Sequence, residues 1–361
     1  MRISIIVANL FGLLAAGPAL DPAFAQNQPV VGPVIGIVAP LSGPTTILGR
    51  QIEAGAKAAA TDLKVQTVST DDQCTADAGR AAAQKLIEAQ AKAVIGFLCT
   101  ESLEAALPAL KQAGIVAITI GARANSLTDK HDKSGWSLIR FAPRADGETE
   151  AVARLLPPRW RDAPFAIVDD GTISGRDLAD AFRAGAETIG LKPALIDSYR
   201  PDLDNQVGLI TRLRRADAAN LFVGGARQDV AIIARDAAAR NMPLVIAGGE
   251  DLRNDVSDLD LPAGTLMVGL PDWRNSAPVL EALKQQNIEP EGYVLPAYAA
   301  VQIAVAAQGR PGAGDFASYV GSPFETAIGQ VAFDAKGDLA HSPYALFQWT
   351  GAAFAPLGAA Q

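Results

Sequence analysis

Short apolar runs and alanine-rich runs alternate regularly along most of this 361-residue chain, and this order limits the folds that it can adopt. Runs rich in valine and isoleucine predict strands at residues 34–41, 65–72, 93–99 and 115–120. The alanine-rich runs between them predict helices at residues 51–62, 75–89 and 102–113. Nearly continuous apolar strands are typical of parallel sheets whose two faces are both covered by helices. The order therefore predicts a doubly wound α/β unit with right-handed crossovers.

The alternation stops at a polar stretch, residues 122–136, which we expect to be a surface loop. A strand-like stretch follows at residues 139–143, and the alternation then starts again. The second series of predicted strands covers residues 165–169, 194–199, 220–225, 244–248 and 265–270. The predicted helices between them cover residues 175–189, 205–216 and 228–240. A second α/β unit therefore follows the first.

The tail after Pro271 has too few predicted strands to form a third α/β unit. It contains two helical runs (277–285 and 293–308) and two β-like stretches (328–333 and 345–349). The simplest way to bury its apolar helix is to return it to the first unit. We therefore expect two lobes, joined by several crossovers around a ligand cleft: residues 26–143 with 272–344, and residues 144–271 with 345–361. Ligands of open parallel sheets bind beyond the carboxyl ends of the strands.

The first 25 residues have the pattern of a secretory signal peptide. Arg2 precedes an apolar stretch, and the sequence Ala23-Phe24-Ala25 fits a cleavage site after Ala25. No cysteine follows that site, which argues against a lipid anchor. We expect a protein exported to a bacterial periplasm.

Composition excludes several classes of function. A net charge of −8 without a basic block argues against nucleic-acid binding. Two histidines and two cysteines are too few for a typical zinc site, and no phosphate-binding glycine motif is present, so we predict no metal and no cofactor. His131 and His341 are both expected to be exposed, and neither lies beside a nucleophile in a known motif. No catalytic residue is predicted.

The two cysteines form an even pair in a chain that we expect to be exported. Cys74 follows the predicted strand 65–72, and Cys99 ends the predicted strand 93–99. Neighbouring parallel strands would bring the two residues together, and oxidising compartments favour disulfides. We predict a disulfide between them; the alternative is two buried free thiols.

Three residues in strand-end loops could bind the charged groups of a ligand. Thr100 begins a helix directly after a strand, and the free N–H groups there suit a carboxylate, although Thr100 could simply cap the helix. Glu250 follows two glycines and could receive an ammonium group. Arg123 could pair with a carboxylate. The alternative for both charged residues is a solvated position on the rim.

Four motifs in this order give the chain a resemblance to a known family: residues 39–44 (APLSGP), 71–74 (DDQC) with 94–99 (VIGFLC), 298–302 (YAAVQ) and 333–339 (FDAKGDL). The chain resembles type I periplasmic binding proteins, specifically the Leu/Ile/Val-binding group of ABC importers. The resemblance covers nearly the whole chain after the leader. It implies two lobes that close on a ligand, and delivery of that ligand to an inner-membrane ABC permease.

The resemblance also implies roles for single residues. Thr100 stands where a hydroxyl and its backbone amide hold an α-carboxylate. Gly121 stands where a carbonyl receives the α-ammonium, and Glu250 where an acid pairs with it. Arg123 replaces a threonine that helps to bind the headgroup, and Tyr293 matches an aromatic wall.

Three positions depart from the family's pattern. Leu48, Ser174 and Ala226 stand where the Leu/Ile/Val-binding proteins have tyrosines, which implies a roomier pocket or another ligand. The positive charge of Arg123 favours a dicarboxylic or bulkier amino acid, or a small carboxylic acid. In the alternative, Arg123 pairs internally with Glu250 or Asp229 and never contacts the ligand.

The sequence therefore predicts a monomeric periplasmic solute-binding protein that binds an amino acid or a similar small carboxylate and catalyses no reaction. One alternative is a ligand-sensing module that feeds a receptor or regulator. A more remote alternative is an exported hydrolase that uses Ser174 or Ser102. The hydrolase hypothesis is disfavoured because the sequence shows no histidine paired with either serine.

Overall fold

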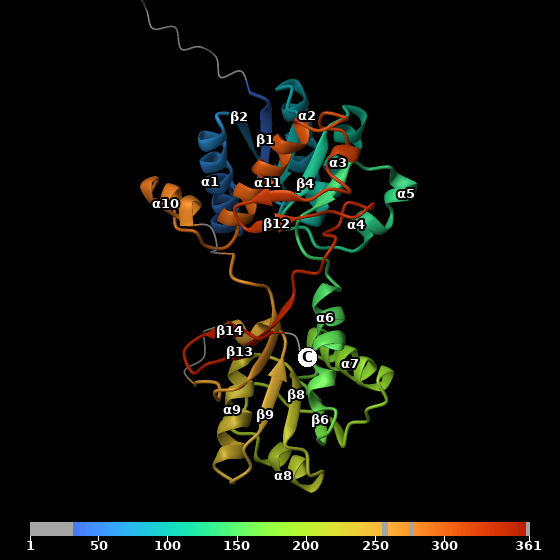
Figure 1. Cartoon of the computed structure of the whole chain (residues 1–361), viewed down its shortest axis with the longest axis vertical. Coiled ribbons are helices and arrows are strands. Elements are labelled where there is room, and N and C mark those ends of the chain that lie inside the picture. The colour runs from blue at the N-terminus through green and yellow to red at the C-terminus, as the bar shows by residue number, and fades with distance from the viewer. Residues whose placement is uncertain (1–31, 255–258, 274–276, 359–361) are drawn as a thin grey trace, which may run out of the picture. The chain divides into compact units, whose positions relative to one another are not determined.

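The computed structural model describes residues 32–254, 259–273 and 277–358 (Figure 1). The predicted signal peptide and its cleavage site after Ala25 lie outside these residues. Among the helices that are described, none is both long enough and apolar enough to cross a membrane.

The first sheet has five parallel strands in the order β2-β1-β3-β4-β5. Its strands are β1 (Val34–Ala39), β2 (Gln66–Asp71), β3 (Ala93–Gly96), β4 (Val116–Thr119) and β5 (Leu138–Arg140). β1 is an internal strand, with Ile37 opposite Ser69 of β2 on one side and Ile95 of β3 on the other. Each strand begins and ends within three residues of its predicted bounds.

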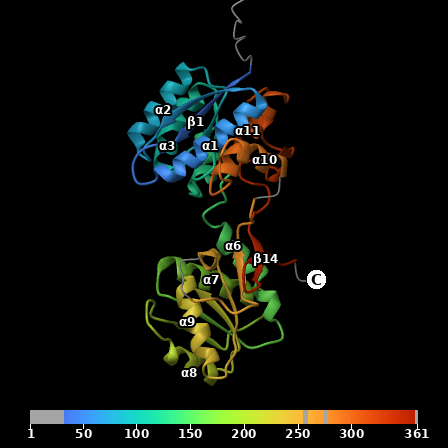
Figure 2. The same cartoon turned by 90° about the vertical axis from the view of Figure 1, so that its left-hand side faces the viewer.

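The pleat of β1 divides the core of this sheet into two layers. Ile35 and Ile37 point to a core formed with α1 (Thr46–Leu63) and α11 (Val294–Gln308). Val38 points to the opposite core, formed with α2 (Ala76–Glu88) and α3 (Thr100–Gln112). Figure 2 shows α1 beside α11, and α2 beside α3. α11, the apolar helix of the tail, therefore packs on the first sheet. Together with α1 it covers one face of that sheet, which α1 alone could not cover.

The rest of the tail joins the same core. It contains α10 (Ala277–Gln285) and a hairpin of β11 (Phe324–Thr326) with β12 (Gly329–Val331). Phe324, Val331 and Phe333 are buried with the residues of α11. The motif at residues 333–339 thus helps to complete the core of the first sheet.

The second sheet has seven strands in the order β14-β13-β10-β9-β8-β6-β7. Its strands are β6 (Phe165–Asp169), β7 (Leu195–Ser198), β8 (Asn220–Gly224), β9 (Val245–Gly248), β10 (Leu266–Gly269), β13 (Ala345–Trp349) and β14 (Phe354–Pro356). The first five are parallel, and β13 and β14 add an antiparallel edge. The predicted α/β class with two parallel sheets is confirmed, with this antiparallel addition.

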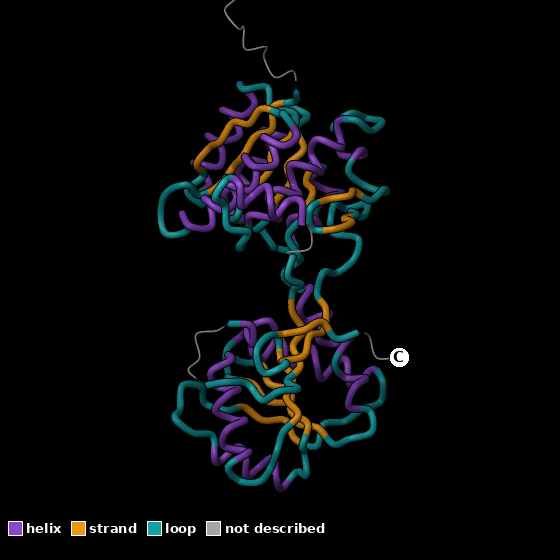
Figure 3. The backbone as a smooth tube through the Cα atoms, turned by 60° about the vertical axis from the view of Figure 1, so that its left-hand side comes forward, coloured by secondary structure: helices purple, strands orange, loops and turns teal. Residues whose placement is uncertain are grey.

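Helices cover both faces of the second sheet as well (Figure 3). α6 (Gly147–Leu155) and α7 (Ile173–Thr188) share one core with the sheet. α8 (Val207–Arg215) and α9 (Arg227–Ala238) share the opposite core. The sequence pattern did not predict α6, because its first turn is polar and carries Glu148 and Glu150.

The chain passes from one sheet to the other three times. The first crossover follows β5 (residues 141–146), the second follows β10 and begins at residues 270–273, and the third precedes β13 (residues 340–344). The antiparallel β13 is therefore reached from the first sheet by the third crossover.

The polar stretch 122–136 is not a simple surface loop, so that prediction was wrong. It contains two short helices, α4 (Ser126–Asp129) and α5 (His131–Ser134). Leu127 and Thr128 of α4 are each 1% exposed. They are buried because Leu127 packs in the core, while the Thr128 hydroxyl donates to Asp338 (2.8 Å).

A buried ion pair fixes this region to Asp338, which lies just before the third crossover. The Arg140 side chain at the end of β5 is 0% exposed, and its Nε lies 2.7 Å from Asp338 Oδ1. Arg144 of the first crossover contacts the other oxygen of Asp338 at 3.1 Å and also pairs with Asp129 and Asp146. Burial lowers the pKa of Arg140, and the charge of Asp338 opposes that shift. The pair thus ties together segments that are 198 residues apart.

Candidate ligand-binding site

Strand order defines one switch point in each sheet. β1 lies between β2 and β3, and β6 lies between β7 and β8, so the direction in which strands are added to the sheet reverses at β1 and at β6. Ligands of such sheets bind beyond the carboxyl ends of the strands at this point. Leu48 and Thr100 follow β1 and β3 at the first switch point. Ser174 and Ala226 follow β6 and β8 at the second.

The amino end of α3 is open. Cys99 is the N-cap residue in an extended conformation, Thr100 is the first residue inside the helix, and no side chain caps the helix. The alternative that Thr100 serves as an ordinary cap is therefore wrong. Uncapped N–H groups and the positive end of the helix dipole suit a carboxylate.

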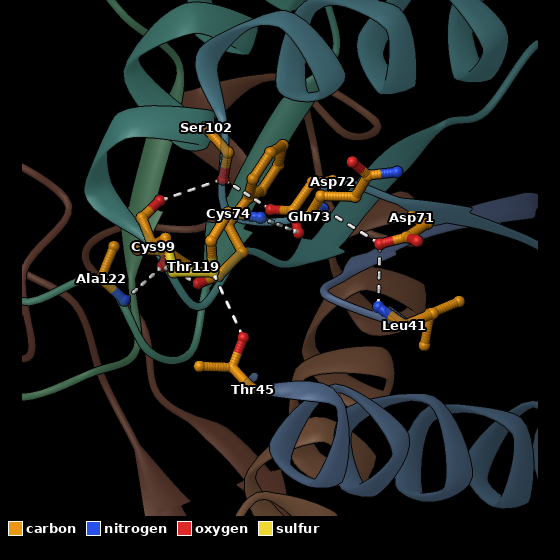
Figure 4. The surroundings of a disulfide bond; sticks show 11 residues. Leu41, Thr45, Asp71, Asp72, Gln73, Cys74, Cys99, Ser102, Thr119 and Ala122 are labelled. Carbon is orange, nitrogen blue, oxygen red and sulfur yellow. Dashed lines mark hydrogen bonds between the residues drawn. A yellow bond between two sulfur atoms is a disulfide. The ribbon is translucent and has the colours of Figure 1, made fainter. Parts of the chain in front are cut away.

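A buried carboxyl group holds α3 in place. Ser102 in its first turn donates to Asp72 Oδ2 at 2.5 Å, and Asp72 is 0% exposed (Figure 4). Burial raises the pKa of Asp72, and the hydrogen bonds from Ser102 and from the Cys74 N–H oppose that shift. The Ser102 hydroxyl is thereby committed to the fold, and no histidine among the described residues pairs with it.

Cys74 and Cys99 form a disulfide, as predicted, with their Cα atoms 5.2 Å apart. The geometric reason given for it was partly wrong. The two cysteines follow β2 and β3, which are not neighbours because β1 lies between them. Gln73 and Cys74 have positive φ, and this left-handed turn after β2 brings Cys74 across the end of β1. The bond therefore locks the loops on both sides of the switch point.

We expect reduction of this disulfide to lower the free energy of unfolding by about 3 kcal/mol, because it closes a loop of 25 residues. Urea unfolding with and without dithiothreitol measures the difference. The double variant Cys74→Ser/Cys99→Ser is the control, and dithiothreitol should leave its midpoint unchanged. An unchanged wild-type midpoint under reduction would contradict the prediction.

The loop after β4 lies against the loop after β3. The Thr119 hydroxyl donates to the Phe97 carbonyl (2.9 Å) and accepts from the Ala122 N–H (3.0 Å). A Cβ atom on Gly121 would come within 2.8 Å of Leu98 Cα, so a glycine is needed for this close approach. The predicted site residue Gly121 is thereby held against Leu98, which lies two residues before Thr100 in the chain.

Arg123 does not form the internal ion pair that we considered. Its guanidinium donates to the Tyr344 hydroxyl, and its Nε is buried without a hydrogen-bond partner. Within the described part of the chain, no carboxylate lies at ion-pair distance from it, Glu250 and Asp229 included. Its positive charge therefore lacks a direct counterion.

Glu250 is connected to Arg123 through Tyr344. It begins the short 3-10 helix η2 (Glu250–Arg253), and its carboxylate lies 3.5 Å from the Tyr344 hydroxyl and 3.3 Å from the Leu270 N–H. Its own N–H donates to Glu148 Oε1 at 2.7 Å. Burial raises the pKa of Glu148, the Glu250 N–H opposes this, and the charges of Glu250 and Asp251 raise it further.

Glu148 and Tyr344 were not predicted from the sequence. Glu148 belongs to α6, which the pattern missed, and Tyr344 stands directly before the predicted strand 345–349. A charged residue in the first turn of a helix and an aromatic residue beside a crossover were the available signals. Neither signal identifies a site residue unless it is already known which strands are neighbours in the sheets.

A cavity of about 410 Å³ opens beside the three crossovers. Three predicted site residues line it: Gly121, Arg123 and Tyr293. Glu250 lines an adjoining cavity of about 330 Å³ instead. The other predicted residues (Thr100, Leu48, Ser174 and Ala226) line neither. Ser174 and Ala226 are exposed at the starts of α7 and α9, on adjacent loops, since a Cβ on Gly175 would lie 2.6 Å from the Gly224 carbonyl.

The two histidines give no sign of catalysis. His131 is half-buried rather than exposed, because its ring stacks on Phe316 with centroids 4.7 Å apart. His341 is exposed and lines the larger cavity. Among the described residues, no group of three or more histidine, cysteine or acidic side chains is arranged to hold a metal ion.

Two doubly wound sheets linked by three crossovers, with the uncapped end of α3 at the first switch point and the Thr172-capped end of α7 at the second, fit a solute-binding protein of the two-lobed class. Residues 33–353 match the periplasmic binding protein family, and the chain belongs to that family. Membership of this family implies that the protein acts in the periplasm and that it binds a solute rather than catalysing a reaction.

Three proteins illustrate the similarity. A Leu/Ile/Val-binding protein homologue 3 of Brucella melitensis is 28% identical over 337 residues, covering 87% of this chain and 90% of the relative. An ABC transporter substrate-binding protein from Desulfitobacterium hafniense, solved in complex with Leu, is 20% identical with a TM-score of 0.62 and covers 90% and 100% of the two chains. A solute-binding protein of Rhodopseudomonas palustris BisB5, solved with 3,4-dihydroxybenzoic acid, is 17% identical with a TM-score of 0.61 and covers 91% and 96%.

Proposed function

We propose that this protein captures a small carboxylate, an amino acid or a related acid, and delivers it to an inner-membrane ABC permease. The observation that carries the proposal is Arg123, which has no carboxylate at ion-pair distance among the described residues. The uncapped amino end of α3 is a second feature of the same kind. Both attract a carboxylate, one through N–H groups and the other through a planar guanidinium.

The relatives support the class of ligand. Leu/Ile/Val-binding homologues, a leucine complex and a dihydroxybenzoate complex all concern small carboxylates. For an amino acid, Glu250 is the proposed partner of the ammonium group, and the Gly121 carbonyl is a second acceptor. Leu48, Ser174 and Ala226 would then face the ligand with smaller side chains than the tyrosines of the family's pattern.

The same proposal includes the organisation of the chain. We take residues 26–143 with 272–344 as one lobe and residues 144–271 with 345–361 as the other. Sheet membership of the strands and the packing of α11 on the first sheet support this division. Ligand contacts from both lobes would favour the closed form. Cleavage after Ala25 and a monomeric state complete the proposal.

We expect the stripped protein to bind at least one member of a panel of amino acids and small organic acids. The protein is unfolded and refolded to remove carried-over solute, and isothermal titration calorimetry then measures binding to each compound. Mass spectrometry of the released solutes gives an independent identification. If no carboxylate in the panel binds the refolded protein, while a neutral or cationic solute does, the proposed ligand class is wrong.

A further inference from the structure

The cavity beside the crossovers has walls suited to a ring rather than to a short polar side chain. Aromatic residues contribute from three separate places: Phe141 from the first crossover, Trp273 from the second, and Tyr293 before α11. Ile120, Ile328 and Leu339 add aliphatic surface. Its volume of about 410 Å³ falls within the usual range for sites that bury small molecules, about 300–1,000 Å³.

The residues that line this cavity carry charge of one sign. Arg123 is one of them, and among the described residues its guanidinium donates only to the neutral Tyr344 hydroxyl, while Glu148 and Glu250 lie outside the lining and act at longer range. None of the described residues that line the cavity is acidic. A carboxylate placed here would find a guanidinium with a buried, unpartnered Nε, whereas an ammonium group would find no carboxylate.

Glu250 cannot easily serve an ammonium group from within this cavity. It lines the adjoining cavity rather than this one, and each of its carboxylate oxygens already accepts one hydrogen bond, from the Leu270 N–H (3.3 Å) and from the Tyr344 hydroxyl (3.5 Å). An amino acid would therefore place its ammonium group away from the aromatic walls. An acid without an ammonium group has no second charge to place. Its apolar body can fill the cavity while its carboxylate contacts Arg123.

From this geometry we infer that the ligand is an aromatic or similarly bulky apolar monocarboxylate, whose ring occupies the cavity lined by Phe141, Trp273 and Tyr293. The inference rests on the proposed function, which it narrows from small carboxylates in general to acids that lack an ammonium group. Aromatic rings in the wall favour an aromatic ligand through edge-to-face and offset contacts. A ligand in this place touches all three crossovers.

The test compares an aromatic acid with an uncharged aromatic alcohol and with two amino acids that lack a ring. Phenylacetate, benzyl alcohol, leucine and glutamate are titrated into the stripped full-length protein by calorimetry, with tryptophan fluorescence as a second readout. We expect phenylacetate to bind at least tenfold more tightly than benzyl alcohol, which lacks the charge, and than either amino acid. Tighter binding of leucine or glutamate overturns the inference but leaves the proposed function intact. Binding of benzyl alcohol alone overturns both.

A pair of variants tests the place of binding. Ala332 lines the cavity and is half-buried, so Ala332→Phe should fill it and weaken phenylacetate binding at least tenfold. Ala335 lies three residues along the same segment and is exposed, so Ala335→Phe should leave the affinity unchanged. Circular dichroism and urea midpoints establish that both variants fold. Unchanged phenylacetate affinity in folded Ala332→Phe overturns the inference, and if that variant does not fold, Trp273→Ala takes its place with the same expected loss.

Discussion

Replacing Asp338 by alanine should lower the free energy of unfolding by about 3–5 kcal/mol, the usual cost of removing one partner from a buried ion pair. The substitution leaves the guanidinium of Arg140, which is 0% exposed, without its carboxylate. The remaining acceptors of the Arg140 guanidinium are the Arg123 carbonyl at 3.1 Å, the Ala124 carbonyl at 2.6 Å and the Thr128 hydroxyl at 2.5 Å, and none of them carries a full negative charge. Urea unfolding followed by circular dichroism measures the change.

Asp129 offers a matched control in the same network. Its side chain is 48% exposed and pairs with Arg144, which keeps Asp146 and Asp338 as partners. Asp129→Ala should therefore cost no more than about 1 kcal/mol, as is usual for exposed ion pairs. Asp338→Asn should fall between the two, because it keeps the shape but removes the charge. Equal losses for Asp129→Ala and Asp338→Ala would show that burial does not strengthen this pair.

The motif that contains Asp338 illustrates what sequence patterns reveal and what they leave out. Residues 333–339 contributed to the family resemblance, but no pattern indicated why the motif exists. The structure supplies reasons. Gly337 has φ of 89°, a Cβ there would lie 2.3 Å from the Leu138 carbonyl, and Asp338 neutralises Arg140. Such a pair cannot be derived from sequence because its members are 198 residues apart and neither one is distinctive alone.

The strands were predictable for a physical reason. A strand buried on both faces is apolar along nearly its whole length, so β6 (Phe165–Asp169) was predicted with its observed bounds. β13 (Ala345–Trp349) was also predicted with its observed bounds, although Ala345 and Gln348 are only half-buried. α6 was missed because only a few of its residues face the core and its first turn is acidic. Hydrophobic periodicity reflects the burial of one face of a helix. It therefore does not reveal a short helix that buries few side chains.

The candidate site was predictable in part. Residues that follow strands could be placed at the switch points, because the carboxyl ends of parallel strands share one edge of a sheet. Gly121, Arg123 and Tyr293 do line one cavity. Trp273 and Tyr344 escaped prediction because the crossovers have no periodic pattern, and their positions depend on how three distant segments run side by side.

Arg123 is the residue whose replacement should affect binding most. If it holds the ligand carboxylate, Arg123→Thr removes one partner of a charged hydrogen-bonded pair, which costs about 2–4 kcal/mol. That corresponds to roughly a 30- to 1,000-fold increase in Kd for phenylacetate or for any carboxylate that the wild-type protein binds. Arg123→Lys keeps the charge but loses the planar fork, so its loss should be smaller. Calorimetric titration of the stripped variants measures each Kd.

Measuring stability beside affinity distinguishes a role of Arg123 in ligand binding from a purely structural role. In the structure Arg123 also donates to Tyr344, so a residue that only braced the third crossover would lower the unfolding midpoint when replaced and leave the Kd of the folded protein unchanged. Tyr344→Phe removes that hydrogen bond and keeps the guanidinium, and it should change Kd far less than Arg123→Thr. Arg183→Thr, on the exposed part of α7, is the matched control for the loss of an arginine. A wild-type Kd in folded Arg123→Thr would mean that the charge of Arg123 does not select the ligand.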